Sequence, residues 1–255
     1  MYLFDAHCHL QDKRVSEFTQ IIIDNALNAG VERMVCCGCE PEDWARISYL
    51  ARKYPEIVPS YGVHPWYSTE LCSDWAEKLE CALKEDCTSG VGEIGLDHTL
   101  DPSTFPLQKK NFSLQLEIAS QLNRPVSIHC RKAWGELFSV FKSMKSLPRG
   151  LIHSYSGSPE LVKQLEKLGF FISFSGSVCN PNNRKVQKSI KTVSNQRLLI
   201  ESDSPDNMPY GLRSDYNQPA NLMLIAKRAA FILNVPLEML VHSTYQNALN
   251  LFTKN

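Results

Sequence analysis

The sequence predicts a (β/α)8 TIM barrel, an α/β fold in which eight parallel strands alternate with helices. Three observations predict this fold. Short apolar runs alternate with amphipathic segments along the whole chain, and eight such runs are found. Alternating strands and helices indicate parallel βαβ units. Eight of these units in 255 residues is the usual size of the barrel.

The expected strands are short and several are almost continuously apolar, which is typical of strands buried on both faces of a parallel sheet. A helical pattern lies between each strand and the next. In chain order the expected strands are Tyr2–Ala6, Arg33–Cys37, Ile57–Gly62, Gly90–Gly95, Pro125–Ile128, Gly150–Ile152, Phe170–Phe174 and Leu198–Glu201.

The helix expected after Ser158 shows the local helix signals. Ser158 is a typical N-cap, Pro159 fits the first helical position, and Gly169 supplies a stop. The segment 217–252 predicts two helices with a break near Pro236. Apolar stripes at helical spacing are formed by Leu161, Leu165 and Leu168, and by Leu114, Ile118 and Leu122.

An open doubly wound sheet is the alternative architecture. That fold usually has fewer strands, and the chain lacks a glycine-rich phosphate loop after its first expected strand. We therefore expect a single barrel domain over residues 1–255.

The charge balance restricts how the chain could bind nucleic acid. Lys and Arg total 27, Asp and Glu total 27, and the formal net charge is +0. A neutral chain is not a polybasic protein that holds nucleic acid by bulk electrostatics. The balance is still compatible with a nucleic-acid enzyme whose positive charge is local or supplied by metal ions.

The chain shows no sign of membrane insertion or of disulfide bonding. Its most apolar stretches, such as Leu222–Leu233, contain charges and are too short to span a bilayer, and no signal peptide is recognisable. The nine cysteines are expected to be free thiols in a reducing compartment, the cytoplasm, with the nucleus as the alternative. Cys36 and Cys39 form a C-x-x-C pair without a second pair, so we expect packing roles for them.

Histidines and acids gather where the expected strands end. Active sites of this barrel lie at the carboxyl ends of its strands. Glu93 lies within the fourth expected strand, Asp203 follows the eighth, and only His242 lies away from the strand ends. Each residue alone has an ordinary structural explanation, and we assign His98 to a solvated loop. The joint pattern, however, predicts a functional site. The histidines concerned are His7, His9, His64, His98, His129 and His153.

The residue types in this set favour a site for two metal ions. His7 and His9 lie two residues apart on a strand and therefore point to the same side, whereas Cys8 points away. Glu93 has two oxygens and could bridge two ions. Five or six nitrogen and oxygen ligands exceed the needs of one zinc ion and suit two divalent ions, Zn²⁺, Mn²⁺ or Mg²⁺. The remaining candidate ligands come from later strands: His129, His153 and Asp203.

Six sequence blocks together resemble the TatD family of metal-dependent deoxyribonucleases, which belongs to the TIM-barrel hydrolases. The resemblance covers nearly the whole chain, in order and at family-like spacing. It is carried by Asp5–His9, Gly62–Pro65, Gly92–Asp97, Val126–Arg131, His153–Gly157 and Glu201–Pro205.

The resemblance implies a function and a set of ligands. It implies hydrolysis of DNA phosphodiesters, often from 3′ to 5′ at single-strand ends. It also implies a role in DNA repair and in DNA fragmentation. We expect the protein to be a monomer. Glu93 matches the acid that contacts both metals, and Asp203 matches the last ligand, which orients or deprotonates the attacking water. The other matching ligands are His7 and His9 for the first metal, and His129 and His153 for the second.

Two further residues are candidates for contacts with the phosphate, His64 and Arg131. Their structural alternatives are a turn anchor for His64 and an ion pair with a neighbouring acid for Arg131. The chain also departs from the family pattern Arg-Asn-Glu-Pro, which reads Tyr216-Asn217-Gln218-Pro219 here. The lost cation and acid could alter substrate contacts or local packing.

Two alternative functions remain. One is a barrel hydrolase that acts on a small amide, lactone or phosphoester; Glu93 at the place of a bridging carboxylated lysine disfavours it. The other is a non-catalytic scaffold. The six matching positions all keep metal-binding side chains, whereas a scaffold is expected to have lost at least one.

Overall fold

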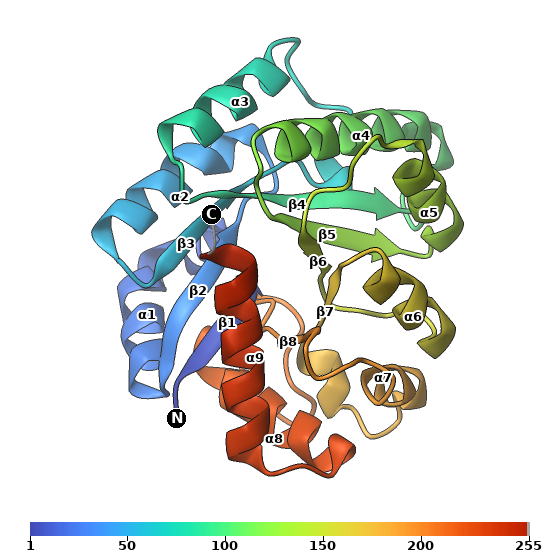
Figure 1. Cartoon of the computed structure of the whole chain (residues 1–255). Coiled ribbons are helices and arrows are strands. Elements are labelled where there is room, and N and C mark those ends of the chain that lie inside the picture. Colours follow the sequence, from blue (N-terminus) through green and yellow to red (C-terminus); the bar gives the residue numbers. More distant parts are fainter. Residues whose placement is uncertain (254–255) are drawn as a thin grey trace.

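Eight parallel strands form one sheet whose spatial order follows the chain from β1 to β8. The computed structural model describes residues 1–253, and Figure 1 shows the strands surrounded by helices. This arrangement confirms the predicted barrel. The strands are β1 (Leu3–Cys8), β2 (Val31–Cys37), β3 (Ile57–Tyr61), β4 (Gly90–Asp97), β5 (Val126–Arg131), β6 (Gly150–Ile152), β7 (Phe171–Phe174) and β8 (Leu198–Ile200).

Backbone contacts between the first and last strands bring the sheet close to closure. β1 lies beside β8, and the segment after β8 hydrogen-bonds to the end of β1. The amide of Asp203 donates to the carbonyl oxygen of His7 at 3.0 Å, and the amide of His9 donates to that of Ser204 at 2.7 Å. Residues from the two ends of the chain therefore meet at the carboxyl ends of the strands.

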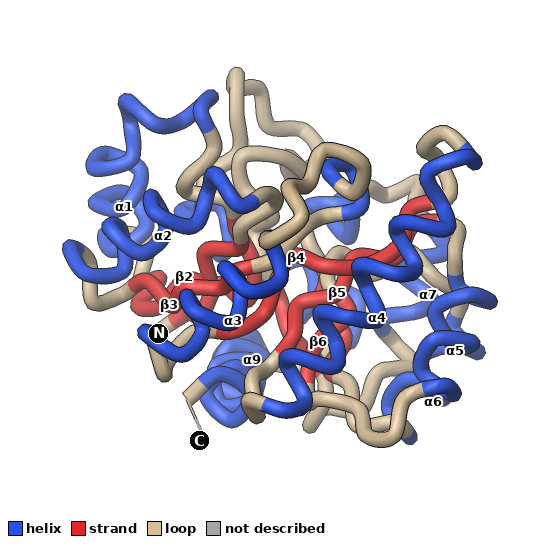
Figure 2. Tube along the Cα trace, turned by 90° about the horizontal axis from the view of Figure 1, so that it is seen from above, coloured by secondary structure: helices blue, strands red, loops and turns tan. Residues whose placement is uncertain are grey.

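The helices lie outside the strands. Figure 2 shows α1 and α2 on one side of the strands and α5, α6 and α7 on the other. The helices are α1 (Thr19–Asn28), α2 (Pro41–Lys53), α3 (Trp75–Glu85), α4 (Phe105–Gln121), α5 (Trp134–Ser143), α6 (Pro159–Lys167), α7 (Arg184–Ile190), α8 (Leu222–Leu233) and α9 (Leu237–Phe252).

Every expected strand except β6 differs from the structure by a few residues at one or both ends, and β1 continues to Cys8, so His7 lies inside this strand. β4 and β5 run farther than predicted because their pairing continues through Gly95 with His129 and Asp97 with Arg131. His129 therefore lies inside a strand and not at its end. In α6, the predicted apolar stripe is wrong at Leu168, which is 43% exposed because the buried face of the helix runs through Val162 and Leu165. Ser158 occupies the N-cap position of α6 without a side-chain capping bond.

Other expectations are confirmed. The break near Pro236 separates α8 from α9, and α9 packs against β1 and β8. None of the helices within residues 1–253 combines the length and apolar character that crossing a membrane requires. No disulfide joins the cysteines of the described chain.

The loop after β8 is organised by the buried amide of Asn217. Its Nδ2 donates to the carbonyl oxygens of Ser202 at 2.8 Å and Asp206 at 3.0 Å, and its Oδ1 accepts from the amide of Gln218 at 2.9 Å. Within this loop Asp203 adopts a left-handed backbone conformation with φ of 55°. Such a conformation is uncommon outside glycine, although Asp tolerates it better than most residues. The Asn217 amide therefore stabilises the loop that carries Asp203.

We predict that Asn217→Ala lowers the free energy of unfolding by about 2–4 kcal/mol, because it leaves buried backbone groups without partners. Urea denaturation measures the change. The control is Asn25→Ala, which removes an exposed hydrogen bond to Gln218 and should change the free energy by about 0.5 kcal/mol or less. Equal effects of the two substitutions would contradict this role of Asn217.

Candidate metal centre

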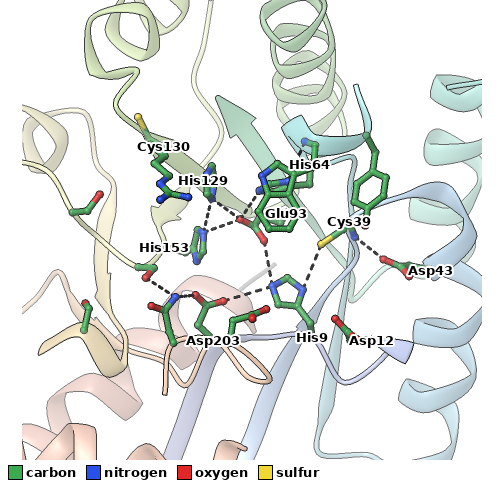
Figure 3. A pocket seen from close by; sticks show the side chains of 18 of the residues that line it. His9, Asp12, Cys39, Asp43, His64, Glu93, His129, Cys130, His153 and Asp203 are labelled. Atoms are coloured by element: carbon green, nitrogen blue, oxygen red, sulfur yellow. Dashed lines mark hydrogen bonds and ion pairs between the residues drawn. The ribbon is translucent and has the colours of Figure 1, made fainter. Parts of the chain in front are cut away.

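Six side chains from five strands meet at the carboxyl end of the barrel. His7 lies in β1 and His9 follows it, Glu93 lies in β4, His129 in β5, and His153 and Asp203 follow β6 and β8. Figure 3 shows the labelled members of this group pointing toward a common space around Glu93. The structure thus brings together all six side chains that the sequence proposes as ligands: His7, His9, Glu93, His129, His153 and Asp203.

A close approach of two backbones fixes Glu93 beside His129. Gly95 has φ of +148°, and a Cβ atom at this position would lie 1.9 Å from the carbonyl oxygen of His129. Only glycine fits this position without displacing β5.

The two oxygens of Glu93 face two different pairs of imidazoles. Oε2 lies 3.3 Å from Nε2 of His7 and 3.3 Å from Nε2 of His9. Oε1 lies 2.9 Å from Nδ1 of His129 and 2.7 Å from Nε2 of His153. One carboxylate is therefore shared between two groups of nitrogen donors.

Asp203 completes the first group. Its Oδ1 lies 3.6 Å from Nε2 of His9 and 3.8 Å from Nε2 of His7, while its Oδ2 accepts a hydrogen bond from Nδ2 of Asn207. Burial raises the pKa of Asp203, but the hydrogen bond with His9 and the neighbouring imidazoles outweigh this effect and lower the pKa to about 2. The carboxylate is therefore ionised at neutral pH.

Acceptors behind the rings decide which ring nitrogens point into the centre. Nδ1 of His9 lies 2.8 Å from the carbonyl oxygen of Cys37, and Nε2 of His129 lies 3.3 Å from Oδ2 of Asp97. Carbonyl and carboxylate oxygens only accept hydrogen bonds, so these ring nitrogens carry the proton. The opposite nitrogens then present lone pairs toward Glu93.

The other two ligand histidines have an acid and a hydroxyl behind their rings. Nδ1 of His153 lies 3.3 Å from Oε1 of Glu201 without forming a hydrogen bond, and Nδ1 of His7 lies 2.7 Å from the hydroxyl of Ser127, which can donate or accept. Nitrogen and oxygen atoms thus converge in a buried space. Burial lowers the pKa of His9 and His153, but the nearby acidic groups outweigh this effect and hold it well above its usual value, so these rings attract positive charge into the centre.

The donor set fits divalent metal ions. Three overlapping groups have ligand atoms within 4.8 Å of one another, and Glu93 belongs to two of them. Burial raises the pKa of Glu93, but the surrounding imidazoles hold it well below its usual value, so the carboxylate is ionised. Imidazole and carboxylate ligands suit Zn²⁺ and Mn²⁺, and carboxylates also suit Mg²⁺. The three groups are His7–His9–Glu93, His7–His153–Asp203 and His64–Glu93–His129.

His64 differs from the other four histidines. Its Nδ1 accepts a hydrogen bond from the amide of Trp66 at 3.2 Å, so the proton lies on Nε2, 3.3 Å from Oε1 of Glu93. Burial lowers the pKa of His64 to about 4. His64 is therefore a neutral hydrogen-bond donor that faces the centre.

Arg131 ends β5 and lines the pocket above the centre. Its side chain is exposed and makes no ion pair with any residue in the range 1–253, so the alternative of a neighbouring acid is wrong. His98 lies outside the pocket lining, 3.8 Å from Glu136, as expected for a loop residue.

The cysteines behave as expected with one exception. Cys8 is buried in the core and donates to the carbonyl oxygen of Val35. Cys36 is also buried, but Cys39 lines the pocket with its Sγ 3.6 Å from Nδ1 of His9, so a pure packing role for Cys39 is wrong. Burial raises the pKa of the Cys39 thiol to about 11, which keeps it protonated near neutral pH.

The departure from the family pattern lies away from the pocket. Tyr216 stacks on Phe18 with 6.0 Å between ring centroids, and Oε1 of Gln218 accepts from Asn25. Neither replaced residue lines the pocket. The departure therefore changes local packing beside α1 and leaves the metal centre intact.

For Asp97 the sequence left open a hydrogen bond to a ligand histidine or a mere strand end, and the structure shows the contact with His129. Ser127 and Glu201 were passed over. Ser127 and His129 lie two apart on β5 and share a face, which was a usable signal, whereas Glu201 and Asp203 lie beyond the end of β8, where strand spacing does not apply. The carbonyl of Cys37 carries no such signal because every residue has a carbonyl.

Comparisons with known proteins agree with this geometry. The sequence model of the family described as "TatD related DNase" matches residues 4–253. The chain is 30% identical to "Uncharacterized metal-dependent hydrolase YabD" of Bacillus subtilis, over 99% of this chain and 100% of the relative. It is 27% identical to "3'-5' ssDNA/RNA exonuclease TatD" of Citrobacter koseri, over 98% of each chain.

A solved structure extends the similarity to three dimensions. The crystal structure of YJJV, a TatD homolog from Escherichia coli k12, superimposes with a TM-score of 0.94 at 27% identity, covering 99% of this chain and 98% of the other. The family match, the fold and the metal-binding residues lead to one conclusion: the chain belongs to the TatD-related DNase family of metal-dependent hydrolases.

Proposed function

We propose that this hydrolase is a deoxyribonuclease that hydrolyses phosphodiester bonds from 3′ to 5′ at single-strand ends, with two divalent ions. The printed name of the Citrobacter koseri relative, a 3'-5' ssDNA/RNA exonuclease, supports the substrate class. One observation supports the binding of two ions: the two carboxylate oxygens of Glu93 face separate pairs of imidazoles.

In this proposal each group of side chains holds one divalent ion, Zn²⁺, Mn²⁺ or Mg²⁺, and Glu93 contacts both. Bound ions of this kind lower the pKa of coordinated water from 15.7 toward roughly 7. The first ion would be held by His7, His9, Asp203 and Glu93, and the second by His129, His153 and Glu93.

Asp203 is the proposed general base. It is ionised, its Oδ1 faces the first group, and Asn207 holds its Oδ2. A carboxylate held in this way can orient a water molecule and accept its proton.

His64 and Arg131 are the proposed contacts to the phosphate. Nε2 of His64 carries a proton and faces the centre, and Arg131 lines the pocket without an acidic partner among the described residues. Donors placed where charge develops stabilise the transition state, and a guanidinium binds phosphate oxygens well.

End-labelled single-stranded and double-stranded DNA, incubated with Mn²⁺, Mg²⁺ or Zn²⁺, tests the proposed function. We expect metal-dependent shortening from the 3′ end that EDTA abolishes, with single strands degraded faster. RNA, small phosphoesters and small amides serve as comparison substrates. Hydrolysis confined to small amides or esters would show that the proposal is wrong.

We predict that Asp203→Asn lowers kcat about 10²- to 10⁴-fold, the usual contribution of a general base, while metal stays bound. The control is Asp215→Asn, because Asp215 lies in the same loop, is exposed and does not line the pocket. Steady-state kinetics on the labelled DNA measures the change. Wild-type turnover by Asp203→Asn would exclude this residue as the base.

The low pKa of His64 predicts a pH dependence of stability in metal-free protein. In the unfolded chain His64 binds a proton near pH 6.5, whereas in the folded chain it does so only near pH 4. The free energy of unfolding is therefore unaffected by His64 above pH 6.5 and falls as the pH drops below that value. Between pH 6.5 and pH 4, the free energy of unfolding of His64→Asn should therefore fall by about 3 kcal/mol less than that of wild type. Urea denaturation in EDTA measures both proteins, and parallel pH profiles would contradict the prediction.

A further inference from the structure

Trp66 is a large aromatic side chain left exposed at the wall of the catalytic pocket. It is 56% exposed, whereas Trp44 and Trp75 are 7% exposed and Trp134 is only partly exposed. The pocket has a volume of about 530 Å³, within the usual range for ligand sites, and Trp66 is part of its lining. An indole that stays exposed inside a pocket is available to a ligand with an apolar face.

The position of Trp66 is fixed by its neighbours. It lies in the 3₁₀ helix η2 (Pro65–Tyr67), where Pro65 is buried and the amide of Tyr67 donates to the carbonyl oxygen of His64 at 3.0 Å. Its ring centroid lies 4.9 Å from that of His64, with an angle of 85° between the rings. Since His64 contacts Glu93 directly, the indole lies one side chain away from the metal centre.

The walls of the pocket differ in chemistry. One group of lining residues offers hydrogen-bond donors without a carboxylate: Arg131, Ser154, Ser156, Ser177 and Asn183. Another group contains acids: Asp12, Glu40, Asp43 and Asp206. Figure 3 shows His64, Asp43 and Asp12 on the side of the pocket opposite to Cys130 and His153.

Because the walls differ in chemistry, we expect them to contact different parts of a bound strand, its phosphates and its bases. Arg14 is already paired with Asp12 and Asp206 at 2.7 Å each, and Lys13 is the other cation beside these acids, so the four acids make this wall less favourable for phosphate than the donor-rich wall. The donor-rich wall suits the phosphates, whereas the indole on the His64 side suits a neutral, planar base.

We propose that Trp66 stacks on the base of the terminal nucleotide whose phosphate is bound at the metal centre beside His64, and thereby selects unpaired strand ends. The inference rests on the proposed nuclease function and adds the group that recognises the substrate. A base inside a duplex has neighbours on both faces, whereas an unpaired terminal base can turn out and stack on an aromatic side chain.

Substrates that lack the terminal base test the contact. Stacking on an aromatic side chain changes affinity about 5- to 150-fold per base. Wild type should therefore show a kcat/KM lower by about this factor on single strands with an abasic 3′-terminal residue. Trp66→Leu should show the same loss on ordinary DNA and no further loss on abasic DNA, and its preference for single strands over blunt duplexes should shrink.

Two variants serve as controls. Trp66→Phe keeps an aromatic plane and should retain most of the discrimination between ordinary and abasic ends. Tyr49→Leu removes an aromatic side chain that is 57% exposed on α2 outside the pocket lining, and it should behave as wild type. Equal losses of Trp66→Leu on ordinary and abasic strands would overturn the proposal and leave Trp66 a structural support for His64.

A binding measurement separates this inference from the nuclease proposal. A single-stranded oligonucleotide with phosphorothioate ends should quench tryptophan fluorescence in wild type, and Trp66→Phe should lose that quench. Quenching without hydrolysis of any DNA would refute the nuclease proposal and retain the stacking contact. Hydrolysis by wild type that ignores the terminal base, or an equal quench in both proteins, would refute the stacking contact and leave the nuclease proposal standing.

Discussion

The shared carboxylate of Glu93 is the constraint on which the site depends. Imidazole lone pairs approach its two oxygens from opposite groups, and acceptors behind the rings prevent the imidazoles from turning away. Without metal ions the acidic groups hold protons on His9 and His153, and divalent ions would replace those protons. The arrangement of ligands, outer acceptors and the loop that carries Asp203 is explained by this requirement.

The barrel meets this requirement by combining residues from distant parts of the chain. A strand places its alternate side chains on one face, so His7 and His9 reach the centre together. The loop after β8 then brings Asp203 back to β1, where backbone hydrogen bonds and the amide of Asn217 hold it. The contacts that join the two ends of the sheet therefore also position residues of the site.

The sequence predicted the fold and the set of converging side chains because both depend on periodicity and strand ends. It could not give the ring tautomers, since the carbonyl of Cys37 and the amide of Trp66 are backbone groups whose positions only the folded chain defines. For the same reason it left His64 open between a turn anchor and a donor; the structure shows that its backbone anchors the turn while Nε2 faces Glu93. Leu168 was misplaced because the buried face of α6 runs through Val162 and Leu165, which the chosen leucine spacing did not follow.

A formal net charge of +0 is consistent with the proposed substrate if the positive charge is local. Two divalent ions would bring +4, against about −2 from the ligands Glu93 and Asp203, so roughly +2 remains at the ions themselves, and Asp97, Glu201 and the acidic wall confine it to the centre. Such a site attracts one phosphate and predicts a weak dependence of DNA affinity on salt. The central claim is that the shared carboxylate holds two ions, and elemental analysis of the purified protein after equilibration with Mn²⁺ or Zn²⁺ tests it most directly. We expect two divalent ions per chain and a loss of at least one in Glu93→Ala; at most one ion in wild type, or two ions retained in Glu93→Ala, would contradict the account.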